Sequence, residues 1–408
     1  MDLTGGSGKE KKAVEYTAQA VSPIADGEVK LRIGERSFTA AAVFDTAEVF
    51  FTDINAIEFS DHVTTVRADS GNYVFSRMGQ WAQMFYDELC KSYNKMVLRA
   101  FFVSGKPIIA AKGDYCFTEG AAVSGKANVE VYGNCVVATP PNSNARRIPL
   151  CFTVGMDKGA HELTLKLNSG ESYTFSKLGY DTSSFSEAIE NNIRELRNKA
   201  LAALKDIDYS LSTPQASQLA KLIPEGAAAP IGQLAAIAPS FAAAVETKIS
   251  TTRAEDSYNV FKNLCDPAQI WVGFRKNDAP EEKHKAPEEE KPEPYLFWMI
   301  APSPCGKYAA VEFAEADTAT FIYRINGKFS EWAMQLNRAL EAISFKREVI
   351  RLTDDELLKP EYAEYYMAAK RTASLQFIRK NFIGRLIHSS PEAWERKLKE
   401  VWSGGKAE

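Results

Sequence analysis

The heptapeptide Tyr73-Val-Phe75-Ser-Arg-Met-Gly79 returns one hundred residues later as Tyr173-Thr-Phe175-Ser-Lys-Leu-Gly179. Apolar and polar residues alternate before each closing glycine, which is typical of a strand with one buried face. After each glycine the apolar residues recur at spacings of 4, 4, 3 and 4. This spacing predicts a helix laid on a core. The first stripe is Phe85, Leu89, Tyr93, Met96 and Ala100, and the second is Phe185, Ile189, Ile193, Leu196 and Ala200.

A third and more divergent signature, Phe321-Ile-Tyr323-Arg-Ile325-Asn-Gly327, occurs near the C-terminal end. It precedes an apolar stripe with a slip of one residue after the glycine: Trp332, Leu336, Leu340 and Ile343. Three occurrences of strand, glycine and helix predict three related units along the chain.

Short β segments separated by turn signals precede each signature. The strands expected in the first unit are 14–18, 28–33, 37–43, 49–57, 64–68 and 73–76. Those expected in the second are 107–111, 115–118, 128–132, 135–138, 148–154, 162–167 and 173–176. Six or seven antiparallel strands followed by one helix form an α+β unit, in which the helix covers an open end of a curled sheet.

This series of short strands, ending in Tyr173 to Gly179 and the helix from Phe185 to Leu204, resembles the pleckstrin-homology-like (PH-like) superfold and its GRAM-type relatives. The stretch from Tyr73 to Ala100 carries the same resemblance, which covers residues 13–206 well and 257–350 less well. The third copy departs from it, with only four or five expected strands, at 270–275, 295–300, 309–313 and 318–325. The resemblance implies that some such domains hold anionic lipid headgroups near their first two strands, using clustered Lys and Arg.

The predicted fold class is α+β: tandem PH-like domains, each a curled antiparallel barrel or sandwich capped by a C-terminal α-helix, with a helical insert and C-terminal helices. Its predicted parts are PH-like domains at 13–102 and 103–206, a helical hairpin at 207–256, a divergent PH-like domain at 257–350 and C-terminal helices at 351–403. The stretch 276–294 is rich in Glu, Lys and Pro, and it predicts a solvated loop because it has no core-forming residue.

Two helical regions have recognisable patterns outside these units. The Ala-rich segments 217–223 and 232–249 predict a pair of helices joined near Pro224. In the tail, Leu375, Ile378, Phe382 and Leu386 fall at spacings of 3, 4 and 4, which predicts one helical stripe. The sequence Ser389-Ser390-Pro391-Glu392 then predicts a new helix with a serine cap.

Composition excludes several classes of protein. The chain has 408 residues, of which 45% are hydrophobic, and a formal net charge of −4. This charge argues against a general nucleic-acid binder, whose footprint is usually basic. Six cysteines without a CxxC pair favour reduced thiols over a disulfide framework. The N-terminal residues have no apolar run typical of a secretion signal, so a cytoplasmic protein is expected.

Motifs for catalysis or metal binding are absent from the sequence. The four histidines do not fall at metal-ligand spacing, and there is no GxSxG or GxGxxG motif. Gly5-Gly-Ser-Gly8-Lys9 lacks the spacing and the following Ser or Thr of a phosphate loop. We therefore expect no enzyme activity, no cofactor and no metal.

Basic side chains give the only candidate binding residues. Lys30 and Arg32 share one face of an expected strand, and Arg36 follows a turn. The second unit offers a more scattered set: Lys106, Lys112, Lys126, Arg146 and Arg147. Such residues could bind an anionic ligand, since Arg pairs well with phosphate, although Glu28 and Glu35 lie among the first group.

Two functions follow as hypotheses. The preferred one is a non-enzymatic, cytosolic scaffold that binds protein partners, because open sheet edges and the groove beside a capping helix can accept a peptide strand. The alternative is peripheral binding of anionic lipid headgroups through the basic strand residues. A nucleic-acid partner is not expected.

Overall fold

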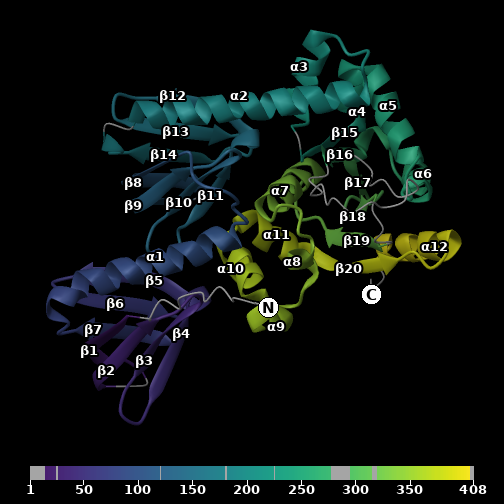
Figure 1. Cartoon of the computed structure of the whole chain (residues 1–408). Helices are drawn as coiled ribbons and strands as arrows, with labels where there is room; N and C mark the ends of the chain where they lie inside the picture. The colour runs from purple at the N-terminus through teal and green to yellow at the C-terminus, as the bar shows by residue number, and fades with distance from the viewer. Residues whose placement is uncertain are drawn as a thin grey trace, which may run out of the picture.

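The computed structural model describes residues 14–23, 26–119, 121–179, 182–224, 226–276, 295–314 and 319–404. It has an α+β fold with three antiparallel sheets, here sheets A, B and C, and helices at the C-terminal end (Figure 1). The predicted fold class is confirmed at this level. Lys276, the first residue of the predicted loop 276–294, is the last residue of a strand. The rest of that loop, with His284, and the segment Gly5 to Lys9 lie outside the described residues.

Sheet A and one long helix form the first unit. The strand order is β4-β3-β2-β1-β7-β6-β5, so that the first and last strands pair in the middle. Helix α1 follows the last strand and lies against the sheet (Figure 1). The elements are β1 (Glu15–Val21), β2 (Gly27–Ile33), β3 (Ser37–Ala41), β4 (Thr46–Phe50), β5 (Ile54–Ser60), β6 (Val63–Ala68), β7 (Gly71–Ser76) and α1 (Ala82–Ala100).

Sheet B repeats this plan in the second unit. Its order, β11-β10-β9-β8-β14-β13-β12, corresponds strand for strand to that of sheet A. The elements are β8 (Ile109–Glu119), β9 (Ala121–Val131), β10 (Cys135–Thr139), β11 (Arg146–Pro149), β12 (Thr153–Lys158), β13 (Glu162–Leu167), β14 (Ser172–Ser176) and α2 (Thr182–Ile207).

Three local details recur at the same places in both units. A 3-10 turn separates the fourth and fifth strands, at Phe51–Asp53 and at Leu150–Phe152. A shift in register then follows at the start of β5 and of β12. The turn before each helix uses left-handed backbone at Arg77 and at Lys177, with φ of 58° and 55°. The two signatures therefore build the same strand, turn and helix.

The predicted apolar stripes of both helices face their sheets. All five stripe residues of α1 are buried, and Phe85 packs edge-on against Tyr16 and Phe75. Phe185, Ile189 and Ala200 of α2 are buried, while Ile193 and Leu196 are half-buried. In each unit seven antiparallel strands are followed by one capping helix, which is the arrangement expected from the sequence.

Strand ends differ from the prediction where a turn was misjudged. The expected strands 107–111 and 115–118 are one strand, β8, because Gly113-Asp114 continues the extended chain beside β9. The expected strands 49–57 and 148–154 are each split by a 3-10 turn. Phe51 and Phe152 lie in these turns and are buried, as an inward-facing strand residue would be. The sequence pattern therefore does not reveal the break between the strands.

Sheet C has a different plan from sheets A and B. It is a meander in the order β15-β16-β17-β18-β19-β20, and it takes its edge strands from outside the range predicted for a third PH-like unit. β15 precedes that range and β20 follows it. The strands are β15 (Ala228–Pro230), β16 (Trp271–Lys276), β17 (Tyr295–Pro302), β18 (Tyr308–Phe313), β19 (Ala319–Arg324) and β20 (Phe382–Ile387). The four strands expected from the sequence correspond to β16–β19 within a few residues.

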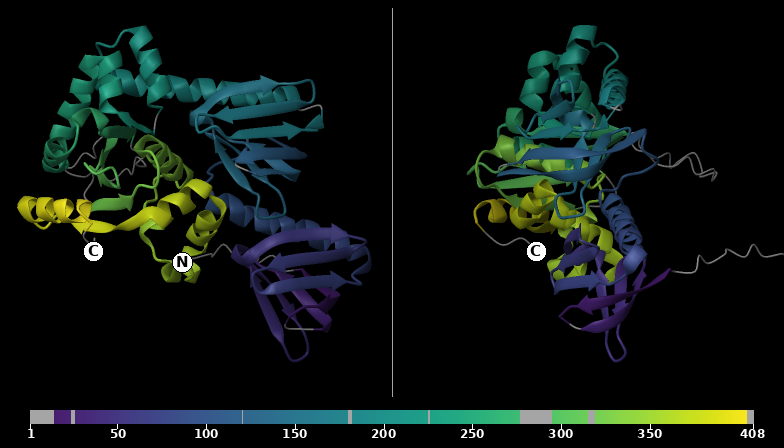
Figure 2. Two further views of the ribbon diagram at one scale, coloured as in Figure 1. Left: turned by 180° about the vertical axis from the view of Figure 1, so that it is seen from behind. Right: turned by 90° about the vertical axis from the view of Figure 1, so that its left-hand side faces the viewer.

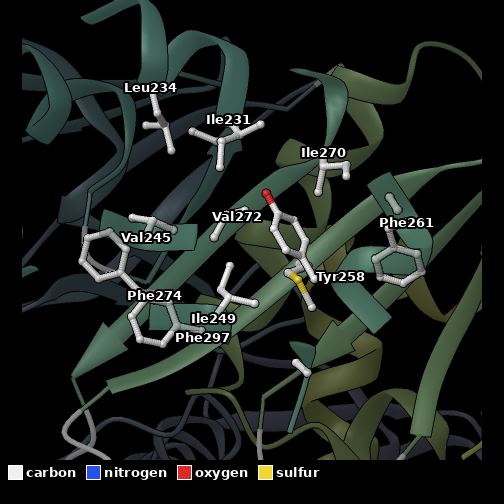
Figure 3. Packing of buried hydrophobic residues seen from close by; sticks show 14 of the residues in the cluster. Ile231, Leu234, Val245, Ile249, Tyr258, Phe261, Ile270, Val272, Phe274 and Phe297 are labelled. Carbon is white, nitrogen blue, oxygen red and sulfur yellow. The ribbon is translucent and has the colours of Figure 1, made fainter. Parts of the chain in front are cut away.

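Helices cover both faces of sheet C, so that every residue of β17 is buried. One face, with Val272, Phe274 and Phe297, packs on the insert helices (Figure 3). The other, with Trp298 and Val311, packs on α7 and the C-terminal helices. Sheet C is therefore a sheet that helices cover on both faces. The described helices that follow the second unit are α3 (Thr213–Leu222), α4 (Ile231–Ile237), α5 (Pro239–Ser250), α6 (Glu255–Leu264), α7 (Phe329–Ala342), α8 (Glu348–Arg351), α9 (Asp354–Leu357), α10 (Ala363–Arg371), α11 (Ala373–Asn381) and α12 (Pro391–Trp402).

The predicted helical stripe from Leu375 to Leu386 is wrong in its second half. Helix α11 ends at Asn381, and the next six residues form β20 beside β19. The apolar spacing resembled that of a helix because Leu386 is buried like the residues before it. Leu386, however, belongs to a strand. The capped start of the last helix is confirmed, since the Ser390 hydroxyl accepts the backbone N–H of Ala393 at 3.2 Å.

Contacts join the first unit to the rest of the chain. An extended segment of the second unit, Pro141 to Ser143, lies along the edge of β5 and forms an isolated bridge between Ala56 and Asn142. From the C-terminal side, the buried guanidinium of Arg371 donates to the carbonyl of Ile54. Figure 2 shows the first unit beside the second unit and α10 in both views.

Gly273 on β16 makes room for the fully buried Trp298 on the paired strand. A Cβ at this position would lie 2.3 Å from atoms of the indole. We expect Gly273→Ala to lower the free energy of unfolding by about 1–3 kcal/mol or more, because the packed ring cannot yield. Chemical denaturation measures this change. Gly133→Ala is the control, since a Cβ there meets nothing within 4 Å, and equal effects of the two changes would contradict the packing described.

Candidate functional site

A cleft of about 1060 Å³ lies where the second unit meets sheet C and its helices. We call it the interunit cleft. One wall comes from the second unit, through the 3-10 turn before β12, the first residues of β12 and the second half of α2. The opposite wall comes from α3, from the facing ends of β16 and β17, and from the end of α7. The described residues that carry its chemistry are Arg147, Cys151, Phe152, Val154, Arg197, Lys199, Asp206, Lys221, Arg275, Lys276, Tyr295, Glu341 and Phe345.

Helix α2 forms one side of the cleft because it is longer than its sheet. Its 26 residues span about 39 Å at 1.5 Å per residue. The first half covers sheet B through Phe185, and the last turns bury Leu204 and Ile207 among the insert helices. Between these two contacts the helix exposes Arg197 and Lys199. The helix thus bridges two cores, and Arg197 and Lys199 line the cleft between them.

A buried ion pair closes the bottom of the cleft. The guanidinium of Arg147 on β11 donates to the carboxylate of Glu341 on α7, and only 3% and 12% of these side chains are exposed. A second pair, Arg338 with Glu171 at 2.7 Å, joins the same helix to the second unit. These contacts fix α7 against sheet B and hold the two walls together.

The opposite wall is held by contacts around the start of β17. The Tyr295 hydroxyl donates to Asp206 on α2 at 2.8 Å, linking the two sides. The guanidinium of Arg275 lies 5.0 Å from the ring centre of Phe345. That ring in turn packs against Trp298, with centroids 5.0 Å apart. The aromatic residues of the cleft are therefore already engaged in packing.

The cleft carries an excess of positive charge. Six basic and two acidic side chains line it among the described residues. Glu341 forms an ion pair with Arg147, and Asp206 accepts a hydrogen bond from the Tyr295 hydroxyl. Arg197, Lys199, Lys221 and Lys276 are all exposed, and none of them forms an ion pair with another described residue. An anionic group would therefore meet several cations that no other described residue neutralises in an ion pair.

The thiol in the cleft is not chemically activated. Burial, with a further contribution from Glu341, raises the pKa of Cys151 far above its ordinary value. Burial likewise raises the pKa of Cys135, near Arg147, to about 11. Thiols with such pKa values stay protonated near neutral pH, and the protonated form is a poor nucleophile. Within the described ranges, no group of His, Cys, Asp and Glu has the arrangement of a metal site.

The basic residues singled out from the sequence lie at separate places. Lys30 and Arg32 both pair with Glu15, at 3.0 and 2.6 Å, and Arg36 donates to the carbonyl of Pro360 at 2.9 Å. Lys106 and Lys112 are exposed in the second unit. Arg146 pairs with Glu119 at 2.8 Å, and Arg147 belongs to the buried pair with Glu341. Of these residues only Arg147 lines the interunit cleft.

The basic residues of the cleft had no local signal in the sequence. They come from α2, from the end of α3 and from the end of β16, which are distant from one another in sequence. Only the packing of sheet C against the second unit brings them to one place.

None of the helices that the structure describes has both the length and the apolar character of a membrane span.

Comparisons with known proteins assign no family. No family model matches the chain, and no curated protein matches it. Among solved structures, one similar chain comes from the structure of the Spt16D Pob3N heterodimer, at 14% identity over 43% of this chain and 89% of that chain, with a TM-score of 0.17. Another is a DNA polymerase sliding clamp from Pseudomonas aeruginosa with ligand, at 9% identity over 81% and 82%, with a TM-score of 0.12. Scores this low carry no functional argument.

Proposed function

We propose that this chain is a non-enzymatic interaction protein that binds an extended segment of a protein partner beside β12 of the second unit. One observation within the chain carries the proposal. An extended segment of the second unit, Pro141 to Ser143, lies along the edge of β5 in the first unit. β5 is the strand of the first unit that is equivalent to β12. The Ile57 N–H donates to the Pro141 carbonyl at 2.7 Å, and the Ser143 N–H donates to the Asn55 carbonyl at 2.9 Å.

The capping helix takes part in that contact. Tyr93 of α1 donates its hydroxyl to the Asn142 carbonyl at 3.0 Å. The first unit thus receives an extended segment between its fifth strand and its helix. Backbone hydrogen bonds to a sheet edge are a general way of binding peptides, since they do not depend on the side chains of the ligand.

The equivalent position in the second unit borders the interunit cleft. Within the described residues β12 pairs only with β13, so it is an edge strand. Val154 at its start is 67% exposed and lines the cleft. Further along, Lys158 pairs with Glu190 of α2 at 2.7 Å and marks where the strand and the helix come together. A partner segment would run from this point toward the cleft.

Binding of anionic lipid is the competing function. Lys30 and Arg32 would have to leave Glu15, and Arg36 would have to leave Pro360, before they could hold a headgroup. Surface pairs of this kind contribute at most about 1 kcal/mol each, so they reduce lipid affinity without preventing binding. We favour the protein partner because the edge of β12 needs no such rearrangement.

Site-specific photo-crosslinking in cells tests the proposal. A photo-reactive amino acid at Val154 is expected to yield covalent adducts with one or a few proteins. Val21 on β1 is the matched control, because it is also a strand valine and is 62% exposed. Adducts formed equally at both positions, or at neither, would argue against a partner site beside β12.

A further inference from the structure

We infer that the partner segment bound at the interunit cleft is acidic, with apolar residues interspersed among its carboxylates. This inference rests on the proposed function and specifies the chemistry of its ligand. Four exposed cations without ion pairs among the described residues stand around one opening: Arg197, Lys199, Lys221 and Lys276. They belong to α2, α3 and β16, so a segment entering the cleft would meet positive charge from both walls.

The charges already bound within the cleft do not offset this field. Arg147 and Glu341 form a closed, buried pair that leaves no net charge. Asp206 is the remaining acidic group among the described lining residues, and it accepts the Tyr295 hydroxyl. Fields focused in a cleft with apolar walls raise the local concentration of an oppositely charged ligand and speed its association. Carboxylates along an extended segment would meet these cations in succession.

Apolar surface in the cleft accounts for the second half of the inference. Val154 is 67% exposed at the start of the edge strand, and half-buried Ile193 and Leu196 on α2 also line the cleft. In a strand added to β12, side chains would point alternately to opposite faces. Carboxylates on one face and apolar side chains on the other would then suit the cationic and the apolar parts of the lining.

A nucleic acid fits the cleft less well, although it also carries negative charge. Single strands are usually held by stacking bases on open aromatic faces as well as by basic residues. The rings lining the cleft are occupied: Phe152 and Tyr295 are buried, and Phe345 lies between Arg275 and Trp298. We therefore assign the cleft to an acidic protein segment.

Fluorescence anisotropy with the full chain tests the assignment. The probe is a labelled short peptide of alternating Glu and Val, and the comparison probe replaces every Glu by Gln. We expect the Glu peptide to bind at low salt and to weaken at roughly 0.5 M salt, where charges are screened over a few ångströms. We expect the double variant Lys221→Glu/Lys276→Glu to bind it about tenfold or more weakly.

A matched variant separates the cleft from the overall charge. Lys91→Glu/Lys248→Glu changes the net charge by the same amount at exposed positions outside the cleft lining. It is expected to bind the Glu peptide as the unmodified chain does. Equal weakening in both variants, or equal binding of the Gln peptide, would overturn the inference.

Two further arms distinguish other occupants. If a single-stranded oligonucleotide displaced the Glu peptide at much lower concentration, the cleft would belong to nucleic acid. If the unmodified chain failed to bind and a variant lacking residues 279–291 bound tightly, the cleft would belong to the chain's own residues. Either result would overturn the inference. Adducts at Val154 without binding of the Glu peptide would leave the proposed function standing and refute only the acidic chemistry.

Discussion

Replacing Phe185 by alanine is expected to lower the free energy of unfolding of the second unit by about 3–5 kcal/mol, as truncations of buried phenylalanine do. Phe185 is 1% exposed and belongs to the core of sheet B, together with Phe175 and Ile189. Its removal would leave a cavity between the helix and the sheet that the neighbouring strands cannot fill. Chemical denaturation, followed by far-UV circular dichroism, measures this loss of stability.

The chain offers close controls for this change. Phe44→Ala makes the same chemical change at a side chain that is 94% exposed, and it is expected to alter stability by less than about 0.5 kcal/mol. Phe85→Ala is expected to cost as much as Phe185→Ala, because Phe85 is fully buried at the equivalent position of the first unit. A denaturation midpoint for Phe185→Ala close to that of Phe44→Ala would show that α2 does not close sheet B.

Breaking the buried pair at the bottom of the cleft is expected to have an effect of similar size. Glu341→Ala would leave the guanidinium of Arg147 buried without a carboxylate, which typically costs about 3–5 kcal/mol. The loss should fall on the junction between sheet B and α7, since the pair joins these two parts. Hydrogen exchange across that junction, together with the denaturation midpoint, measures it.

A double substitution shows whether the unpaired charge is the cause. Arg147→Met/Glu341→Leu removes both charges and fills similar volumes, so it is expected to recover much of the stability lost by Glu341→Ala. If Glu341→Ala alone had the stability of the unmodified chain, the pair would not hold the two walls together. If the double variant were less stable than Glu341→Ala, the packing around the pair, and not the charge, would be responsible.

Much of the first two units could be predicted from the sequence because their signals are local. The alternation before Gly79 and Gly179 and the stripes after them identify strand, turn and helix directly. The third sheet could not be predicted in the same way. The stripe from Trp332 to Ile343 identifies a helix lying on a sheet, but it cannot say whether that sheet curls around its own core or is covered on both faces. The edge strands β15 and β20 come from distant segments, which local patterns do not connect.

The cleft was beyond prediction for a related reason. Lys30 and Arg32 stood out because they are close in sequence, but the pairing of β1 with β2 places Glu15 directly opposite Arg32. A local cluster of one charge is easily neutralised by a neighbouring strand. Arg197, Lys221 and Lys276 did not stand out because they are far apart in sequence, and only the packing of α2, α3 and β16 places them around one opening.

Hydrogen exchange of the full chain with and without the Glu–Val peptide tests the binding site most directly. Slower exchange of the backbone amides of β12 is expected, with little change in β5, whose edge is already bonded by residues 141–143. The same protection should disappear in Lys221→Glu/Lys276→Glu. Peptide binding that left the amides of β12 unprotected, or that protected sheet A as strongly, would contradict a partner site between the second unit and sheet C.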